Sequence, residues 1–176
     1  MTLTLAERAP SFSLRGVDGH EHTLASYDDA EVLVLIQSCN HCPYVLAWEG
    51  RMMAVQRDYA DRGVRLVAFN SNDSSHYPED SFEKMVAHSE SQEFNFDYLY
   101  DPDQSLARAL GAERTPEVFA FDRDRRLVYH GAIDDNRDET AVDRHYLRNA
   151  LDAVIGSSAP EIAETPAVGC TVKWLP

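Results

Sequence analysis

The sequence predicts an α/β fold, with a central mixed β-sheet flanked by helices and an N-terminal β-hairpin. Residues 32–36 are a continuous run of valine, leucine and isoleucine, which is typical of a strand buried on both faces. Apolar residues then recur at helical spacing from Cys42-Pro43 to Gly63, and a second apolar strand pattern follows at 64–69. Strand patterns at 118–121 and 127–130, joined by a short turn and followed by a last helix, predict a hairpin of antiparallel strands that extends this strand–helix–strand unit.

The remaining elements follow from turn residues and apolar spacing. Strand patterns at 12–14 and 22–24 flank the turn at 16–19 and predict the hairpin. A polar loop is expected at 70–78, helices at 79–89, 103–110 and 141–155, and strands within 94–100, 118–121 and 127–130. One domain therefore occupies residues 1–157, and we expect residues 158–176 to be a tail that packs on it.

Acidic residues outnumber basic ones, 30 to 16, which gives the 176-residue chain a formal net charge of −14. Such a surface repels nucleic acid and anionic membranes, so neither is an expected partner. No apolar run approaches the length of a membrane span, and the N-terminus has no signal-peptide pattern, so we expect a cytoplasmic protein. The Asp-rich, Lys-poor composition resembles proteins of salt-accumulating microbes; an ordinary acidic mesophile protein is the alternative.

Two of the three cysteines, Cys39 and Cys42, have a spacing that favours redox or metal chemistry. They lie where the strand at 32–36 gives way to a helix, whose N-terminus carries free N–H groups and partial positive charge. A thiol placed there ionises more readily, and the thiolate is the nucleophile. We therefore expect Cys39, just before the first turn, to attack a disulfide, and Cys42, one turn later, to resolve the mixed disulfide. His41 between them either stabilises a thiolate when protonated or is a solvated side chain, and Asn40 is a candidate modulator of the pair.

A zinc half-site is the alternative for this spacing, with His41 and Cys170 as further ligands. Adjacent His41 and Cys42 would need awkward geometry to share a tetrahedral ion, and the sequence has no second Cys-x-x-Cys pair. We therefore favour redox chemistry and expect no metal. Thr115-Pro116 is either a cis proline in a turn or an ordinary trans proline at the start of a strand.

Four segments taken together resemble the thioredoxin superfamily: Pro10-Ser11-Phe12, Ser38-Cys39-Asn40-His41-Cys42-Pro43-Tyr44, Asn70-Ser71-Asn72-Asp73 and Thr115-Pro116. They are most similar to its redoxin branch, the peroxiredoxin-like proteins related to alkyl hydroperoxide reductase and thiol-specific antioxidant. The resemblance runs from about Ala9 to Trp174 and includes Gly169-Cys170. It implies a thioredoxin-like fold, with Cys39 as the nucleophile, Cys42 as the resolving thiol and Pro116 as a cis proline that faces them.

Three features depart from the better-known patterns of that family. Ser38 stands where thioredoxins usually carry a tryptophan. Arg114 stands where many relatives have a cysteine, and a cation beside Thr115-Pro116 is expected to favour a thiolate. The strand at 32–37 carries no carboxylate of the kind that thioredoxin uses as a proton acceptor. Cys170 either packs the tail against the domain or serves as a further resolving thiol or a link to another chain.

These features predict an enzyme, a thiol–disulfide oxidoreductase that reduces, oxidises or exchanges disulfides through Cys39-Asn40-His41-Cys42 and contributes to cell redox homeostasis. Its expected partners are protein or small-molecule disulfides, or peroxides, and an upstream dithiol reductant. No cofactor is expected, because the sequence has no phosphate-binding glycine-rich loop and no nucleotide or flavin signature. The alternatives are a thiol peroxidase, in which Cys42 would react and Cys39 occupies the threonine position of a Thr-x-x-Cys motif, and a redox-switched interaction module.

The remaining titratable residues are expected to be solvated. Acid pairs such as Asp134-Asp135 have the pattern of exposed faces or turns. The scattered histidines are expected at the surface as well: His20, His22, His76, His88, His130 and His145.

Overall fold

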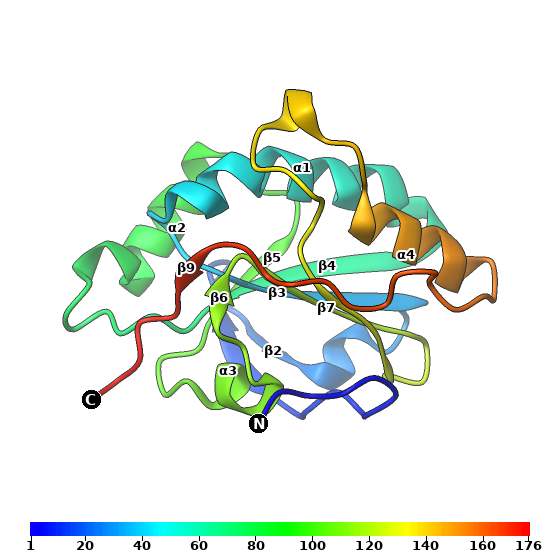
Figure 1. Ribbon diagram of the computed structural model, residues 1–176. Coiled ribbons are helices and arrows are strands. Elements are labelled where there is room, and N and C mark those ends of the chain that lie inside the picture. The colour runs from blue at the N-terminus through cyan, green and yellow to red at the C-terminus, as the bar shows by residue number, and fades with distance from the viewer.

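The computed structural model describes residues 1–176 and contains a seven-stranded mixed sheet in the order β2-β1-β5-β4-β3-β7-β8 (Figure 1). The strands are β1 (Ser13–Gly16), β2 (Glu21–Thr23), β3 (Val32–Ser38), β4 (Val64–Asn70), β5 (Asp97–Tyr100), β6 (Arg114–Thr115), β7 (Glu117–Phe121), β8 (Leu127–Gly131) and β9 (Cys170–Thr171). The α-helices are α1 (Pro43–Tyr59), α2 (Phe82–Ser91), α3 (Ser105–Leu110) and α4 (Tyr146–Ile155). The predicted fold class is confirmed.

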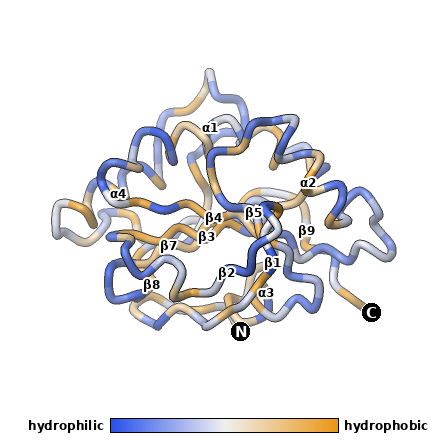
Figure 2. The backbone as a smooth tube through the Cα atoms, turned by 180° about the vertical axis from the view of Figure 1, so that it is seen from behind, coloured by the Kyte–Doolittle hydropathy of each residue, from blue (hydrophilic) through white to orange (hydrophobic).

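The centre of the sheet is the strand–helix–strand unit that the sequence predicts. β3 pairs in parallel with β4 and antiparallel with β7, so Leu35 lies between Val67 and Phe119. All seven residues of β3 are buried, as expected for a strand covered on both faces. The tube in Figure 2 is accordingly hydrophobic along β3, β4 and β7.

Side chains that alternate along β3 enter two separate apolar layers. Val34 faces the layer formed with α1, α2 and α4, which contains Trp48 and Met52. Leu35 faces the opposite layer, where α3 and the N-terminal segment cover the sheet. Figure 1 shows α1 and α4 on one face of the sheet and α3 on the other. The central strands are therefore packed on both faces, by one apolar layer on each side.

Helix α1 begins immediately beyond the carboxyl end of β3. Pro43 occupies its first position, where the missing N–H removes no hydrogen bond, and Gly63, with φ +80°, follows the 3-10 turn that ends it. The N-cap residue is Cys42 itself. Both cysteines therefore precede the helix, and Cys42 stands at the helix start that the sequence pattern predicts.

Two helices begin three or more residues later than the apolar pattern predicts. Residues 78–80 form a 3-10 turn, and α2 starts after Ser81, whose hydroxyl accepts a hydrogen bond from the N–H of Lys84. Residues 139–141 form a second 3-10 turn, so α4 starts at Tyr146 rather than at residue 141. The first of these turns matters for the site, because it carries Asp80 into the interior.

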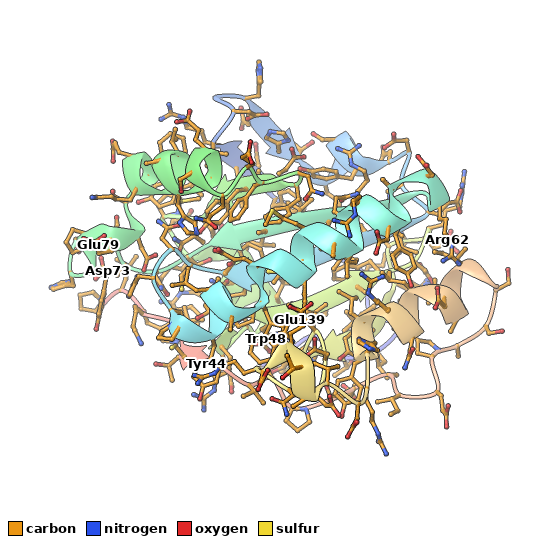
Figure 3. All side chains as sticks on the ribbon, turned by 90° about the horizontal axis from the view of Figure 1, so that it is seen from above. Tyr44, Trp48, Arg62, Asp73, Glu79 and Glu139 are labelled. Atoms are coloured by element: carbon orange, nitrogen blue, oxygen red, sulfur yellow. The ribbon has the colours of Figure 1, made fainter.

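The expectation that Asp134 is exposed is wrong. Its side chain is 2% exposed and accepts hydrogen bonds from the indole N–H of Trp48 and from the guanidinium of Arg51, at 2.8 and 2.7 Å. Figure 3 shows Trp48 on the side of α1 that faces the turn with Glu139. The long connection between β8 and α4 is therefore fixed to α1 by a buried ion pair.

Three of the histidines expected to be solvated are mostly buried and bonded to acids. His88 contacts Glu49 at 2.6 Å, and His130 contacts Glu117 at 2.7 Å. His22 contacts Asp18 at 2.9 Å. His88 and Glu49 lie 39 positions apart, a contact that the sequence pattern does not reveal. Asp18 and His22 lie within the predicted hairpin, four positions apart, where the pattern shows their proximity but not the burial of His22.

The chain after α4 runs back across the molecule toward β6, as the red segment in Figure 1 shows. His130 in β8 exchanges backbone hydrogen bonds with Ala163 and Thr165. Cys170 and Thr171 then form β9, which pairs antiparallel with Arg114 and Thr115 of β6. No helix of the structure is both long and apolar enough to span a membrane.

Candidate active site

The Cys39–Cys42 pair lies at the carboxyl end of β3, between the strand and the first turn of α1. Cys39 is 2% exposed and Cys42 is 3% exposed, so both thiols are buried. The Sγ atom of Cys39 lies 3.7 Å from the hydroxyl oxygen of Thr115, and the Sγ atom of Cys42 lies 3.5 Å from the Thr115 carbonyl oxygen. The Thr115-Pro116 bond is cis, and Pro116 is buried next to Thr115.

The third cysteine is part of the same site. The pairing of β9 with β6 sets Cys170 opposite Thr115. Its Sγ atom lies 2.6 Å from that of Cys42, and its carbonyl oxygen lies 3.5 Å from the Thr115 hydroxyl. Cys42 is thus the central sulfur atom, with Cys39 on one side and Cys170 on the other.

The surroundings of the three thiols shift their pKa values in different directions. A hydrogen bond from the Cys39 thiol lowers the pKa of Cys42 well below the ordinary cysteine value, and further hydrogen bonds from Cys170, the N–H of Val45 and Thr115 add to this effect. The same Cys39–Cys42 hydrogen bond, followed by burial and the nearby Asp80 carboxylate, raises the pKa of Cys39. Burial and the contact with Cys42 raise the pKa of Cys170 to about 11. The reduced site therefore favours one negative charge, on Cys42.

This charge distribution gives a measurable pH dependence. A cysteine whose pKa is lowered on folding is ionised above its folded pKa, so we expect thiolate ultraviolet absorbance from the reduced protein well below about pH 8.5, the ordinary cysteine midpoint. The Cys42→Ser variant should lack this absorbance. Titration of folded protein, with circular dichroism recorded in parallel, measures both. Absorbance that appears only near the ordinary midpoint, as in the unfolded chain, would contradict the assignment.

The loop between the cysteines is held by Asn40. Its amide Nδ2 donates to the carbonyl oxygen of Glu79, and its Oδ1 accepts a hydrogen bond of 2.7 Å from the buried hydroxyl of Tyr98. Its backbone N–H donates to Asp80 at 2.8 Å. Asn40, predicted only as a modulator, therefore fixes the loop to β5 and to the turn before α2.

Asp80 is a site residue that the sequence reasoning missed. It is fully buried and accepts hydrogen bonds from the backbone of Asn40, the amide of Asn70 at 3.1 Å and the amide of Asn72 at 2.9 Å. The Nδ1 atom of His41 lies 3.1 Å from its second oxygen. The segment 70–73, which includes the Asn70 and Asn72 that bond Asp80, is part of the family resemblance and so indicated that this region belongs to the site. Nothing in the sequence, however, distinguishes Asp80 from its exposed acidic neighbours.

Two predicted modulators have surroundings other than those expected. His41 has a side chain that is 41% exposed, and it contacts Asp80 rather than standing free in solvent. Arg114 is exposed, and its backbone N–H donates to Glu117. The pKa shifts of the three thiols have other causes: contacts among the thiols, burial, Thr115, Asp80, Lys173 and the backbone of Val45 and Tyr44.

The zinc alternative requires metal-binding atoms that converge. The metal-binding atoms of Asp18, His22 and Asp97 lie within 4.8 Å of one another. These residues belong to the β1–β2 turn, to β2 and to the start of β5. The three sulfur atoms do not form a group of this kind. Cys42 interacts with both other thiols, an arrangement suited to thiol–disulfide exchange.

A family model described as Redoxin matches residues 4–150, most of the chain and all of the region that holds Cys39, Cys42 and Thr115-Pro116. The chain belongs to the Redoxin family. No curated protein matches its sequence significantly. Among solved structures, this redoxin is similar to a hypothetical protein of Sinorhizobium meliloti 1021, with a TM-score of 0.93, 38% identity, and coverage of 99% of this chain and 97% of that chain.

An uncharacterized conserved protein of Geobacillus kaustophilus is also similar to this redoxin, with a TM-score of 0.93, 38% identity, and coverage of 98% of this chain and 93% of that chain. The thioredoxin domain of a thiol-disulfide oxidoreductase from Bacteroides vulgatus has a TM-score of 0.63 at 11% identity, covering 73% of this chain and 89% of that chain. The fold is therefore thioredoxin-like, as the sequence resemblance implies.

Proposed function

We propose that this redoxin is a thiol–disulfide oxidoreductase whose reaction centre is the Cys39–Cys42 pair. The observation that carries the proposal is the position of the two thiols, buried at the N-terminus of α1 and each in contact with Thr115. The interaction between them lowers the pKa of Cys42, so the reduced pair favours one negative charge and one proton. Two adjacent thiols that share one negative charge supply the nucleophile and the resolving group of a disulfide exchange.

The proton that the two thiols share allows the reaction to proceed without an outside base. Its transfer from Cys39 to Cys42 makes Cys39 the nucleophile. The Cys39 sulfur attacks a disulfide R–S–S–R′, so that a Cys39–S–S–R bond forms and R′–S⁻ leaves. Cys42 then attacks the Cys39 sulfur, which closes the Cys39–Cys42 disulfide, and the departing R–S⁻ takes the proton of Cys42. Two electrons pass to the substrate, and the reverse sequence oxidises a dithiol.

This proton transfer takes the place of the core carboxylate that the strand at 32–37 lacks. Asp80 supports it indirectly, since its hydrogen bonds to Asn40 and its contact with His41 hold the loop between the two cysteines. The proposed substrates are protein or small-molecule disulfides, and an upstream dithiol reductant would restore the thiols. The cytoplasmic location stays a prediction from the sequence.

Cysteine variants test the proposal directly. We expect Cys39→Ser to reduce the rate of insulin disulfide reduction by dithiothreitol to the uncatalysed level, because the attacking sulfur is lost. Cys42→Ser should instead accumulate a stable mixed disulfide on Cys39, detected by mass spectrometry. Gly50→Ala is a suitable control, because Gly50 lies on the exposed side of α1 and an added Cβ has no neighbour within 4 Å. Unchanged insulin reduction by Cys39→Ser would refute the proposal.

A thiol peroxidase is the second candidate, and the lowered pKa of Cys42 favours it. In that case the Cys42 thiolate would attack hydrogen peroxide, and Cys39 would stand in the position of the threonine in a Thr-x-x-Cys motif. Stopped-flow oxidation separates the two candidates. Rapid reaction with peroxide that is lost in Cys42→Ser and retained in Cys39→Ser would favour the peroxidase.

A further inference from the structure

The segment 169–175, here called the C-terminal strap, covers the reaction centre. Its two β9 residues pair with β6, and Val172, 3% exposed, donates its backbone N–H to the carbonyl of Glu113. The strap lies between Cys42 and solvent, because Cys170 is directly beside Cys42 and is itself only partly exposed. Cys170 is therefore placed at the reaction centre by the backbone pairing around it.

Contacts on both sides of Cys170 fix its place. The backbone N–H of Lys173 donates to the side chain of Asn72 at 2.9 Å, and the Lys173 carbonyl accepts hydrogen bonds from the N–H of Asp73 at 2.9 Å and the amide of Gln104 at 3.0 Å. On the other side, Gly169 approaches β6 so closely that an added Cβ would lie 2.0 Å from the Thr115 carbonyl oxygen.

Taken with the proposed function, on which this inference rests, the geometry points to Cys170 as a third redox-active thiol that exchanges with the Cys39–Cys42 disulfide. The Cys170 thiolate attacks the Cys42 sulfur. A Cys42–Cys170 bond forms, the Cys39–Cys42 bond breaks, and Cys39 leaves as a thiolate that takes up the proton lost by Cys170. The protein keeps one disulfide throughout, so the step needs no oxidant or reductant beyond the substrate that first oxidised the pair.

The position of Cys42 explains why the exchange runs through this residue. Its sulfur is the neighbour of both other sulfur atoms, and it lies 2.6 Å from that of Cys170. The contact with Cys42 contributes to the raised pKa of Cys170, and that contribution disappears once Cys42 is part of a disulfide. Oxidation of the pair therefore favours ionisation of Cys170, and the exchange links the strap covalently to α1 and restores Cys39 as a thiol.

Tryptic mapping of the oxidised protein distinguishes the two disulfides. Cys39 and Cys42 lie on one tryptic peptide, 16–51, whereas Cys170 lies on another, 149–173. The full chain is oxidised with diamide, its free thiols are blocked after denaturation, and the digest is analysed without reduction. We expect peptides 16–51 and 149–173 to be linked in monomeric protein. In Cys39→Ser this link should be the only intramolecular disulfide, which assigns it to Cys42.

The strap itself supplies the matched variants. Gly169→Ala keeps all three thiols but forces the strap away from Thr115, so the linked fraction should fall several-fold relative to Gly50→Ala. A wild-type digest with a disulfide only inside peptide 16–51, or a Cys39→Ser variant that forms only intermolecular dimers, would overturn the inference and leave the proposed function intact. An oxidised wild type in which peptide 16–51 has neither an internal disulfide nor a link to peptide 149–173 would overturn both.

Discussion

Replacing Asp80 with alanine is expected to lower the free energy of unfolding by about 3 kcal/mol or more, because it leaves three buried hydrogen-bond donors without an acceptor. These donors are the backbone N–H of Asn40 and the amides of Asn70 and Asn72. A buried donor that loses its partner costs about 1–3 kcal/mol. Urea denaturation followed by circular dichroism measures the change.

The same substitution is expected to impair the site beyond its effect on stability. Asp80 holds the Cys39–Cys42 loop through Asn40 and meets the strap through Asn72, whose Oδ1 accepts the backbone N–H of Lys173. Insulin reduction should therefore fall even at temperatures where the variant is folded. Glu79→Ala is the matched control, since Glu79, the residue before Asp80, is exposed at the surface (Figure 3), and its contact with Asn40 is through its backbone carbonyl. Equal stability of the two variants would show that Asp80 does not organise the loop.

Replacing Asp134 with alanine is expected to destabilise the protein by about 3–5 kcal/mol, the usual effect of leaving one member of a buried ion pair alone. Arg51 would keep its charge in a position where its side chain is 10% exposed, and Trp48 would lose the acceptor of its indole N–H. The carbonyl oxygens of Ala47, Asn136 and Arg137 would still accept from Arg51, but they carry no charge to balance it.

The control for Asp134 is an ion pair at the surface. Asp58 contacts Arg57 and Arg148, and its side chain is 39% exposed. Solvent and salt screen such pairs, so Asp58→Ala should change the urea midpoint far less than Asp134→Ala does. Similar losses from the two variants would mean that the connection between β8 and α4 does not depend on the buried pair.

The sequence predicted the elements whose apolar pattern is dense. The run from Val32 to Ile36 has only one reasonable interpretation, and the change to helical spacing after Cys42-Pro43 locates the reaction centre between a strand and a helix. The start of α4 was misplaced because the polar residues before Tyr146 do not reveal a 3-10 turn. The pairing of β6 with β9 was not predicted, because each strand has two residues and their partners lie far apart in the chain.

The acidic residues show the limit of sequence reasoning more clearly. Asp80 and Asp134 stand in polar stretches, and a carboxylate in such a stretch is usually exposed. Their burial depends on partners that are distant in sequence: Asn40 lies 40 positions from Asp80, and Arg51 lies 83 positions from Asp134. The cysteines were easier to predict, because a spacing of two residues between them is itself a local pattern.

The burial of Cys39 and Cys42 beneath the strap turns their sulfur atoms into reporters of local unfolding. A small alkylating reagent reaches them only during the fraction of time in which β9 is detached from β6, so the labelling rate is the rate for an exposed thiolate multiplied by the equilibrium constant for detachment. The temperature and urea dependence of that rate then give the free energy that holds the strap on the domain. The alkylation rate of Cys39 and Cys42 therefore measures the fraction of time for which the redox centre is accessible to a substrate.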